Sequence, residues 1–284
     1  MRSVLVILLF IGANLQAQNF KKHIAYLASD SLHGRGPATA DEHKAAAYIK
    51  AQFKGKKVKT VFQKVPFEGD SATNVLVFFD CKKDSTIILS AHYDHLGMGS
   101  NKSKELINRT GIHNGADDNA SGVALVLETA KWLMKTKKHR YNYVFAFYSA
   151  HEAGLHGSAW FGQSNLCQSL KIRAVLNFDM VGRLDNTSKT VRVTGAKTDA
   201  VFDKYFEANQ KKPVNFRYDD TFLLLSDLKP FAEKNLPTLG FSTGIHDDYH
   251  KKTDDEDKIN YPGMAIIFDS IKGLLLHIEK MPKK

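Results

Sequence analysis

The stretch SGVALVLETAKWLMKTKKHRYNYVFAFYS, residues 121–149, decides the fold class of this 284-residue chain. Its first half places apolar residues at helical spacing over 121–134. Its second half contains an almost wholly apolar run, 143–149, that is typical of a buried strand. Another strand-like run, 86–91, comes before the helix. Strand, helix and strand in this order predict two parallel strands joined by a crossover helix.

The same alternation continues on both sides of this unit. A capping box, Thr39 to Glu42, begins a helical pattern over 45–53. The remaining expected elements are strands at 74–79, 172–178, 190–194 and 237–242, and helices at 156–165, 200–209 and 263–279. We therefore predict a single α/β domain, in which a mostly parallel central sheet is covered by helices on both faces.

The first residues of the chain have a different composition from the rest. Arg2 precedes an apolar run, 4–11, and a stretch of small residues that ends near Ala17. This order predicts a signal peptide over 1–17, cleavage near Ala17, and export of a domain that comprises 18–284. An uncleaved anchor is the alternative, but the apolar run is short for a membrane span, so we expect no stable membrane insertion.

Charge and cysteine content limit the classes of function. The formal charge is +10, but the lysines are dispersed without interleaved stacking aromatics, so we expect a solvated basic surface and no nucleic-acid partner. The two cysteines, Cys81 and Cys167, either form one disulfide or are separate core residues. Two cysteines are too few for a thiolate-rich metal site.

Polar residues gather where the predicted strands end. They are His92 and Asp94 after the strand at 86–91, His151 and Glu152 after 143–149, Asp179 after 172–178, and His246 and His250 after 237–242. A fifth cluster, GADDN at 115–119, leads into the helix at 121. In open α/β sheets the carboxyl ends of the strands form the edge where ligands bind.

The chemistry of these clusters favours a metal site. Nitrogen and oxygen donors without sulfur come from His92, Asp117, Glu152, Asp179 and His250. Such donors suit zinc, or less selectively manganese or cobalt, and a carboxylate can bridge two ions. Asp94 is placed to accept the other N–H of His92. Each residue alone has a simpler explanation, such as a helix N-cap, but their joint placement favours metal binding.

Six stretches in this order resemble the M28 family of zinc-dependent exopeptidases, which includes secreted bacterial aminopeptidases. They are LASDSLHGRGPATADEHKAAAYI (27–49), SAHYDHLGMG (90–99), NGADDNASGVALVLETA (114–130), SAHEAGLHGS (149–158), LNFDMVGR (176–183) and DYHKKTDDEDKI (248–259). The resemblance implies a three-layer sandwich and a metallo-aminopeptidase that removes N-terminal residues from peptides. It implies one or two zinc ions per chain, with cobalt or manganese as substitutes.

The resemblance also implies roles for the candidate residues. Asp117 would bridge two ions, with His92 and Asp179 on one ion and Glu152 and His250 on the other. Asp94 would orient His92, and Asp118 would help to fix an unusual backbone turn. His250 is preferred to His246 because Asp254 follows it in a His-x-x-x-Asp pattern. The other histidines are expected at the surface or behind the ligands: His95, His113, His156 and His246.

The chain departs from the family pattern at His151. The family usually has two adjacent glutamates at 151–152, of which the first is a general base and the second a ligand. His151 could be the base, since its ordinary pKa suits proton transfer near pH 7. It could instead be a further ligand or a neutral substrate contact, or its presence could mark lost activity. The intact ligand set favours the first interpretation, so we predict His151 and Asp94 as the catalytic residues.

Two other functions compete with the aminopeptidase. A glutaminyl cyclase resembles the same family but uses one zinc ion to cyclise N-terminal glutamine. A non-catalytic module could also retain the metal site on a relic of the peptidase fold. Metal content and assays of both reactions would separate these three functions.

Overall fold

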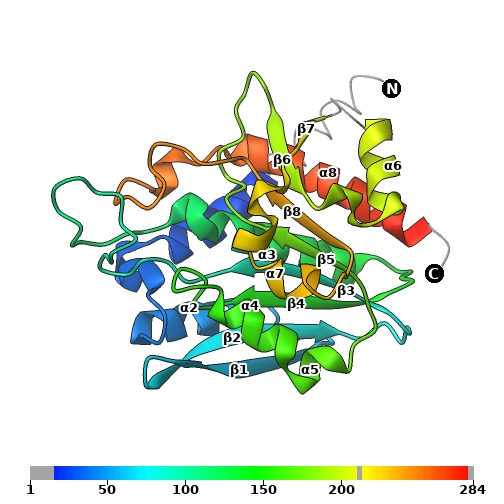
Figure 1. Ribbon diagram of the computed structural model, residues 1–284, viewed down its shortest axis with the longest axis horizontal. Coiled ribbons are helices and arrows are strands. Elements are labelled where there is room, and N and C mark those ends of the chain that lie inside the picture. Colours follow the sequence, from blue (N-terminus) through cyan, green and yellow to red (C-terminus); the bar gives the residue numbers. More distant parts are fainter. Residues whose placement is uncertain (1–15, 210–212, 281–284) are drawn as a thin grey trace.

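The computed structural model describes residues 16–209 and 213–280 (Figure 1). Its centre is an eight-stranded sheet with the order β1-β2-β4-β3-β5-β8-β6-β7. The strands are β1 (Lys59–Phe67), β2 (Asp70–Phe79), β3 (Thr86–His92), β4 (Asn142–Tyr148), β5 (Ile172–Phe178), β6 (Thr190–Thr194), β7 (Asn215–Tyr218) and β8 (Thr238–Ser242). The predicted strands at 74–79, 86–91 and 143–149 are thus confirmed as β2, β3 and β4.

The parallel centre of the sheet was predicted from the alternation of strands and helices. β3 pairs in parallel with both β4 and β5, and β5 pairs in parallel with β8. The sheet becomes antiparallel at β2, which pairs with β1 and β4. Because β3, β4 and β5 run in the same direction, their carboxyl ends lie at one edge of the sheet.

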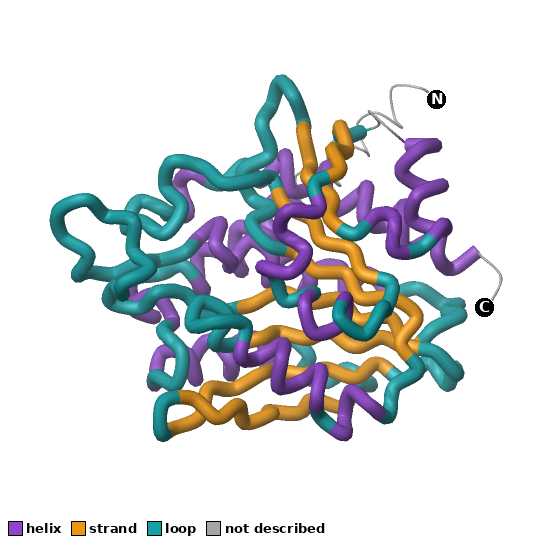
Figure 2. The backbone as a smooth tube through the Cα atoms, in the orientation of Figure 1, coloured by secondary structure: helices purple, strands orange, loops and turns teal. Residues whose placement is uncertain are grey.

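Helices cover both faces of the sheet, as predicted (Figure 2). They are α2 (Ala40–Ala51), α3 (Gly122–Lys135), α4 (His156–Gln163), α5 (Asn165–Gln168), α6 (Ala200–Asn209), α7 (Lys229–Ala232) and α8 (Tyr261–Lys280). Short helical segments are η1 (Asp30–Arg35), η2 (Ala116–Ser121), η3 (Ala196–Thr198), η4 (Asp220–Leu225) and η5 (Glu256–Lys258).

Alternating side chains of β3 divide the core into two layers. Ile87 and Leu89 pack with α2, α3, α6 and α8, whereas Ile88 packs with α4, α5 and α7 on the opposite face. All three side chains are fully buried. Burial on both faces explains why β3 reads as a continuous apolar run.

The capping box predicted at Thr39 is formed in part. Thr39 Oγ1 accepts the backbone N–H of Glu42 at 3.1 Å. Glu42 does not reach back to Thr39 but accepts the N–H groups of Ala38 and Thr73, each at 2.8 Å. The carboxylate therefore joins the start of α2 to β2.

Several segments were not predicted as regular structure, among them β1, β7, α7 and residues 16–27. β1 is an edge strand with several exposed polar residues and a proline, Pro66, which weakens the apolar alternation. Residues 16–27 are helical, and Phe20, Ile24 and Leu27 from this segment are fully buried. Residues 1–15 of the expected signal peptide lie outside the described residues.

Cys81 and Cys167 are both free thiols. Cys167 belongs to the core layer under α4, whereas Cys81 borders the layer on the opposite face of the sheet. The sheet therefore separates them, and the alternative of two independent core residues is the correct one. Across the described residues, none of the helices combines the length and apolar character that crossing a membrane requires.

Candidate metal centre

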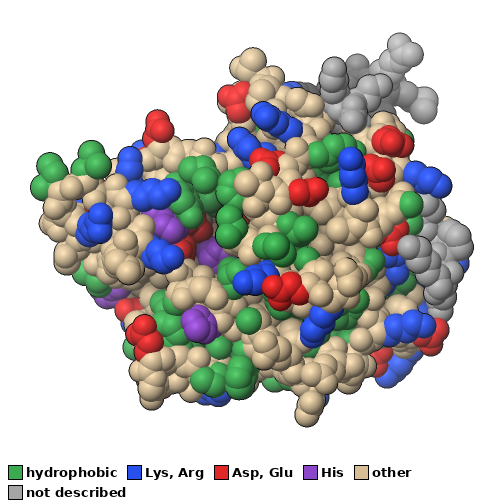
Figure 3. Space-filling view, viewed as in Figure 1, with side chains coloured by type: hydrophobic (Ala, Val, Ile, Leu, Met, Phe, Trp, Pro, Cys, Tyr) green, Lys and Arg blue, Asp and Glu red, His purple; other side chains and the backbone are tan. Residues whose placement is uncertain are grey.

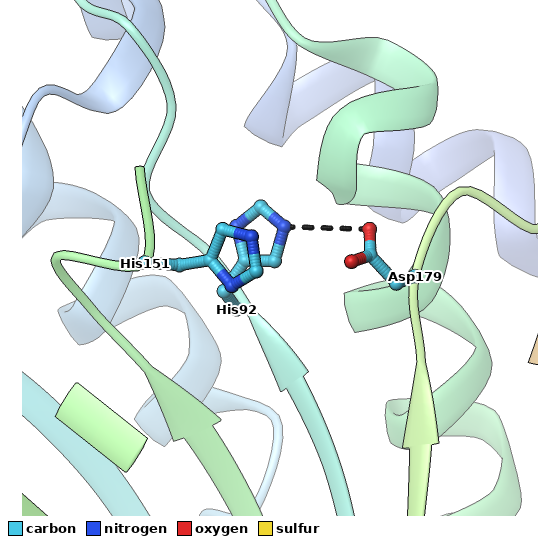
Figure 4. A group of neighbouring side chains, drawn as sticks. All are labelled: His92, His151 and Asp179. Atoms are coloured by element: carbon cyan, nitrogen blue, oxygen red, sulfur yellow. Dashed lines mark ion pairs between the residues drawn. The ribbon is translucent and has the colours of Figure 1, made fainter. Parts of the chain in front are cut away.

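The carboxyl ends of the parallel strands bring three predicted residues together. His92 is the last residue of β3, Glu152 follows β4, and Asp179 directly follows β5. Nε2 of His92 lies 3.4 Å from Oδ1 of Asp179 (Figure 4). Glu152 meets the loop after β8, where its Oε2 lies 3.1 Å from Nε2 of His250.

Asp118 lies between these two pairs. Its Oδ1 is 3.3 Å from Nε2 of His92, and its Oδ2 is 3.3 Å from Nε2 of His250. Burial raises the pKa of Asp118, but the neighbouring histidines hold that pKa well below its usual range. An ionised carboxylate with one oxygen toward each histidine has the geometry of a bridging group.

The structure therefore gives Asp118, and not Asp117, the shared position that we expected for Asp117. Oδ1 of Asp117 accepts the backbone N–H of Gly182 at 2.6 Å, and its Oδ2 lies 3.2 Å from Nε2 of His246. Adjacent side chains project in different directions, so the backbone of the loop decides which aspartate faces the centre. Two consecutive aspartates in the sequence do not reveal this choice.

Asp254 fixes the backbone of this loop. Its Oδ2 accepts the N–H groups of both Asp117 and Asp118 at 3.0 Å, and its Oδ1 lies 3.2 Å from Nη2 of Arg183. The turn also requires glycine at 115, because φ is +59° and a Cβ would lie 2.2 Å from the carbonyl oxygen of Asp118.

A buried arginine supports the centre from behind. Arg35 is 1% exposed and donates only to carbonyl oxygens in the described structure, those of Leu27, Tyr93, Asn114 and Gly115. Burial lowers the pKa of Arg35 to about 10, although nearby carboxylates oppose that shift, so the side chain stays charged at neutral pH. It ties the loops after β3 and before α3 together.

Asp94 acts differently from what we expected. Its carboxylate accepts the backbone N–H groups of His151 at 3.1 Å and Glu152 at 3.2 Å. Nδ1 of His92 donates instead to the carbonyl oxygen of Asp94 at 3.2 Å, while the carboxylate lies 3.7 Å away. Nδ1 of His250 likewise lies 3.0 Å from the carbonyl oxygen of Lys102. Because a carbonyl only accepts, the neutral form of each ring carries its proton on Nδ1, and its Nε2 is then available to bind a metal ion.

His151 is held by a residue that we did not predict. Its Nδ1 lies 3.0 Å from Oδ2 of Asp227, and its ring stacks on His92 with centroids 3.7 Å apart (Figure 4). Burial and His92 lower the pKa of His151, but Asp227 raises it, to about 9. Asp227 lies between η4 and α7, in a segment without strand or helix periodicity, so no sequence pattern marked it.

His95 lies beside two of the candidate ligands. It is fully buried, and its Nδ1 lies 3.2 Å from Oε1 of Glu152 and 3.7 Å from Oδ2 of Asp118. The other three histidines expected at the surface or behind the ligands lie outside this group. His113 bonds Ser103, His156 contacts Phe67, and His246 lies beside Asp117.

The residues present fit a metal ion. Within the described part of the chain, several buried ligand-type atoms have no hydrogen-bond partner: His92 Nε2, both ring nitrogens of His95, Asp118 Oδ2, Glu152 Oε1 and His250 Nε2. Buried polar atoms without partners are costly unless a cation or water satisfies them. The donors fall into two groups, one around His92 and Asp179 and one around Asp118 and Glu152.

A pocket of about 190 Å³ opens beside the first group. Asp118, His151 and Asp179 line one end of it. Its walls are mainly apolar and include Met180, Phe222, Leu225, Phe241, Ile245 and Tyr249. On this face, histidine and acidic side chains lie together in a hollow (Figure 3).

Comparison with known sequences shows the family. The model of "Peptidase family M28" matches residues 74–275. A "Probable zinc metalloprotease" of Pyricularia oryzae is 33% identical over 119 residues, which are 40% of this chain and 22% of that protein. "Leupeptin-inactivating enzyme 1" of Streptomyces exfoliatus is 26% identical over 82% of this chain and 50% of its own length. The chain thus spans half or less of these two relatives.

Solved structures share the fold. The LapA aminopeptidase of Legionella pneumophila has a TM-score of 0.78 and 19% identity over 94% of this chain and 73% of that chain. The glutaminyl cyclase of Bacteroides thetaiotaomicron has a TM-score of 0.74 and 18% identity over 94% of this chain and 98% of that chain. At these identities the likeness establishes the three-layer architecture alone. The family match, which covers most of the chain, is the decisive finding: the chain belongs to peptidase family M28.

Proposed function

We propose that this chain is an exported metallo-aminopeptidase that hydrolyses N-terminal residues from peptides. One observation carries the proposal: buried ligand atoms without hydrogen-bond partners in the described structure gather around Asp118, which also lines an apolar pocket together with Asp179. Zinc, when bound there, would act as a Lewis acid toward the scissile carbonyl and make water a better nucleophile at neutral pH. The names of the aminopeptidase and metalloprotease relatives agree with this activity.

Two ions fit the arrangement of donors. His92 and Asp179 would hold the first ion, Glu152 and His250 would hold the second, and Asp118 would be shared between them. The nitrogen and oxygen donor set suits zinc, and cobalt or manganese could substitute. Asp94 would position the second group, because its carboxylate holds the backbone that carries Glu152.

We assign the role of general base to His151. Oδ2 of Asp227 accepts the Nδ1–H of His151, so Nε2 is the proton acceptor in the neutral form of this ring, which lines the pocket. Burial lowers the pKa of His151 but Asp227 raises it to about 9, so the neutral form would predominate near pH 7 only when cations bound nearby lower that pKa. Nε2 would take a proton from the attacking water and return it to the leaving amine. Asp227 would stabilise the imidazolium in between, much as the aspartate of a serine-protease triad does for its histidine.

A second role for His151 has support of its own. One ring nitrogen lies close enough to His92 and Asp179 for all three to hold one ion. As a ligand, His151 would be needed for metal content, whereas as a base it would be needed only for turnover. Measurement of metal content in His151→Ala distinguishes the two roles.

The lining of the pocket supports exopeptidase action. Its mainly apolar walls beside Asp118 and Asp179 suit the side chain of an N-terminal residue. The preferred substrates would therefore be peptides with a free N-terminal residue. We expect hydrolysis of aminoacyl anilides by the purified, zinc-loaded protein, and no hydrolysis of the N-acetylated forms. Equal rates on both forms would contradict the proposal.

The two competing functions predict different results in the same assay. A glutaminyl cyclase would release ammonia from N-terminal glutamine and bind one zinc ion per chain. A metal-binding relic would bind zinc but turn over neither class of substrate. We favour the peptidase because donors for two ions are present next to the pocket.

We also propose that residues 1–17 act as a signal peptide. Phe20 is fully buried and packs edge-on against Phe268 of α8, so cleavage near Ala17 would leave the core intact. Sequencing the N-terminus of protein recovered from the culture medium or the periplasm tests this. A chain that stays in the cytoplasm and retains Met1 would contradict export.

A further inference from the structure

His95 occupies a position that the proposed activity does not explain. It lies three residues beyond His92, is 0% exposed, and neither of its ring nitrogens has a hydrogen-bond partner among the described residues. Burying an imidazole without partners is unfavourable. A packing role alone would be served equally well by an apolar side chain, so the imidazole calls for a polar partner at this point.

The contacts of His95 indicate what that partner is. Nδ1 lies 3.2 Å from Oε1 of Glu152, yet the two atoms do not form a hydrogen bond. Nδ1 also lies 3.7 Å from Oδ2 of Asp118. Nδ1 of His95 and Oε1 of Glu152 are thus close together without the geometry of a hydrogen bond, which is the arrangement expected of two ligands of one metal ion.

The spacing of the surrounding donors matches one tetrahedral ion. Ligand atoms about 2.0–2.2 Å from a tetrahedral zinc ion are about 3.3–3.6 Å from one another. Nε2 of His250 lies 3.3 Å from Oδ2 of Asp118 and 3.1 Å from Oε2 of Glu152. His95 adds contacts of 3.2 Å to Oε1 of Glu152 and 3.7 Å to Oδ2 of Asp118, so four donor–donor distances lie between 3.1 and 3.7 Å. His95 and His250 approach different oxygens of Glu152, and His95, Asp118 and Glu152 each have one ligand atom within 4.8 Å of those of the other two.

We propose that Nδ1 of His95 is the fourth protein ligand of the second ion, together with Asp118, Glu152 and His250. This inference rests on the proposed metal site and adds a ligand to it. Four protein ligands complete a tetrahedral zinc shell, which is the arrangement of structural sites, whereas catalytic sites keep a position open. The second ion would therefore be closed to substrate.

The pocket supports this division between the two positions. Of the described residues, Asp118, His151 and Asp179 line it, while His92, His95, Glu152 and His250 do not. Substrate entering the pocket thus meets Asp179 and the shared carboxylate of Asp118, and does not meet His95. The ion held by His95 would stabilise the loops that carry Asp118 and Glu152 and would exchange slowly with solution.

Removal of His95 tests the assignment through metal affinity. Loss of an outer-shell partner of a ligand typically lowers metal affinity 10–100-fold, so loss of a ligand should cost at least about 100-fold. We expect wild-type protein to release one zinc ion slowly and one rapidly to a chromogenic chelator. His95→Ala should lose the slow phase, and slow release at the wild-type rate would overturn the proposal.

His113→Asn is the matched control. His113 is also buried on the segment after β3, but Ser103 Oγ at 2.8 Å and the carbonyl of Gly111 at 2.9 Å satisfy its ring nitrogens. This variant loses a buried imidazole and should retain the slow zinc phase. If both variants lost it equally, His95 would be a packing residue and the proposal would be wrong.

His95→Cys provides a spectroscopic test. Nδ1 is close to the backbone, so a cysteine sulfur can reach the same ion with a bond of about 2.3 Å. In the cobalt-loaded variant we expect a sulfur-to-cobalt charge-transfer band, with partial recovery of the slow phase. Absence of the band in a folded, cobalt-loaded variant would contradict coordination at residue 95.

A crystal structure of the zinc-loaded wild-type protein removes any dependence on variants that fail to fold. It should show Nδ1 of His95 about 2.0–2.1 Å from the second ion. A separation above about 3 Å, with water as the fourth ligand, would overturn the assignment. If the wild-type protein bound no zinc at all, the proposed function itself would fail. If His95→Ala released zinc as slowly as the wild type, only the assignment of His95 would fail.

Discussion

Nδ1 of His151 lies 3.0 Å from Oδ2 of Asp227, a side chain that is fully buried at the edge of the metal centre. His151 stands where related peptidases usually have a glutamate, and the aspartate supplies a negative charge behind it. A histidine paired with a buried carboxylate can accept a proton and stay stabilised while charged. The pair therefore offers a chemical substitute for the missing glutamate.

Asp227 should matter for turnover and not for metal binding. Asp227→Asn removes the charge that stabilises the protonated imidazole and can invert the preferred ring tautomer. We expect kcat to fall by about 100-fold or more, with little change in KM or zinc content. Steady-state kinetics with metal analysis of the same samples checks this. A variant with wild-type kcat would show that Asp227 only fills space.

The two adjacent aspartates should differ in their effect on metal affinity. Asp118→Asn weakens the carboxylate that faces both His92 and His250, so we expect both ions to bind at least about 100-fold more weakly. Asp117→Asn keeps the oxygen that accepts the N–H of Gly182 and should bind both ions with nearly wild-type affinity. Zinc titration of the two metal-free variants measures both affinities. If Asp117→Asn bound zinc more weakly than Asp118→Asn, Asp117 would be the bridging residue.

Glu128 should control the acid limit of stability. Burial raises its pKa, but His23 and Lys131 lower it, to about 2 from an ordinary value of 4.5. A depressed carboxylate pKa stabilises the fold above pH 4.5, and this stabilisation is lost as the pH falls toward 2. The shift corresponds to about 3 kcal/mol.

Glu128→Gln should therefore make the unfolding free energy depend less on pH in the acid range. In metal-free protein, we expect its unfolding free energy to be lower than that of the wild type at pH 7 and to converge with the wild type near pH 2. Glu279→Gln is a control, because it removes a different carboxylate, in α8, which accepts the hydroxyl of Tyr143. If the difference in unfolding free energy between the wild type and Glu128→Gln were as large at pH 2 as at pH 7, the charge of Glu128 would not be the cause of that difference.

The fold was predictable because its central elements are strongly periodic. The run 143–149 and the helix before it have apolar patterns that few other structures accommodate, and β4 and α3 formed where expected. β1 was missed because an edge strand exposes one side and tolerates polar residues. The helical residues 16–27 were missed because their start overlaps the expected signal peptide.

The site was predictable in its strand-end residues but not in its loop residues. His92 ends β3, Glu152 and Asp179 follow β4 and β5, and strand ends have a known position relative to the sheet. Asp118 and Asp117 differ only by the path of the backbone, which depends on Asp254 and Gly115. Asp227 comes from a distant segment whose approach to His151 is set by tertiary packing.

The role of His151 is the central claim, and one measurement tests it most directly. It is the kcat for aminoacyl anilide hydrolysis by zinc-loaded wild type, His151→Ala and His151→Glu, with zinc content measured on each sample. We predict that His151→Ala loses at least about 100-fold in kcat at unchanged zinc content, and that His151→Glu, with the family's carboxylate base, recovers most of it. A His151→Ala variant with undiminished kcat, or one that loses zinc together with activity, would contradict the assignment of His151 as the general base.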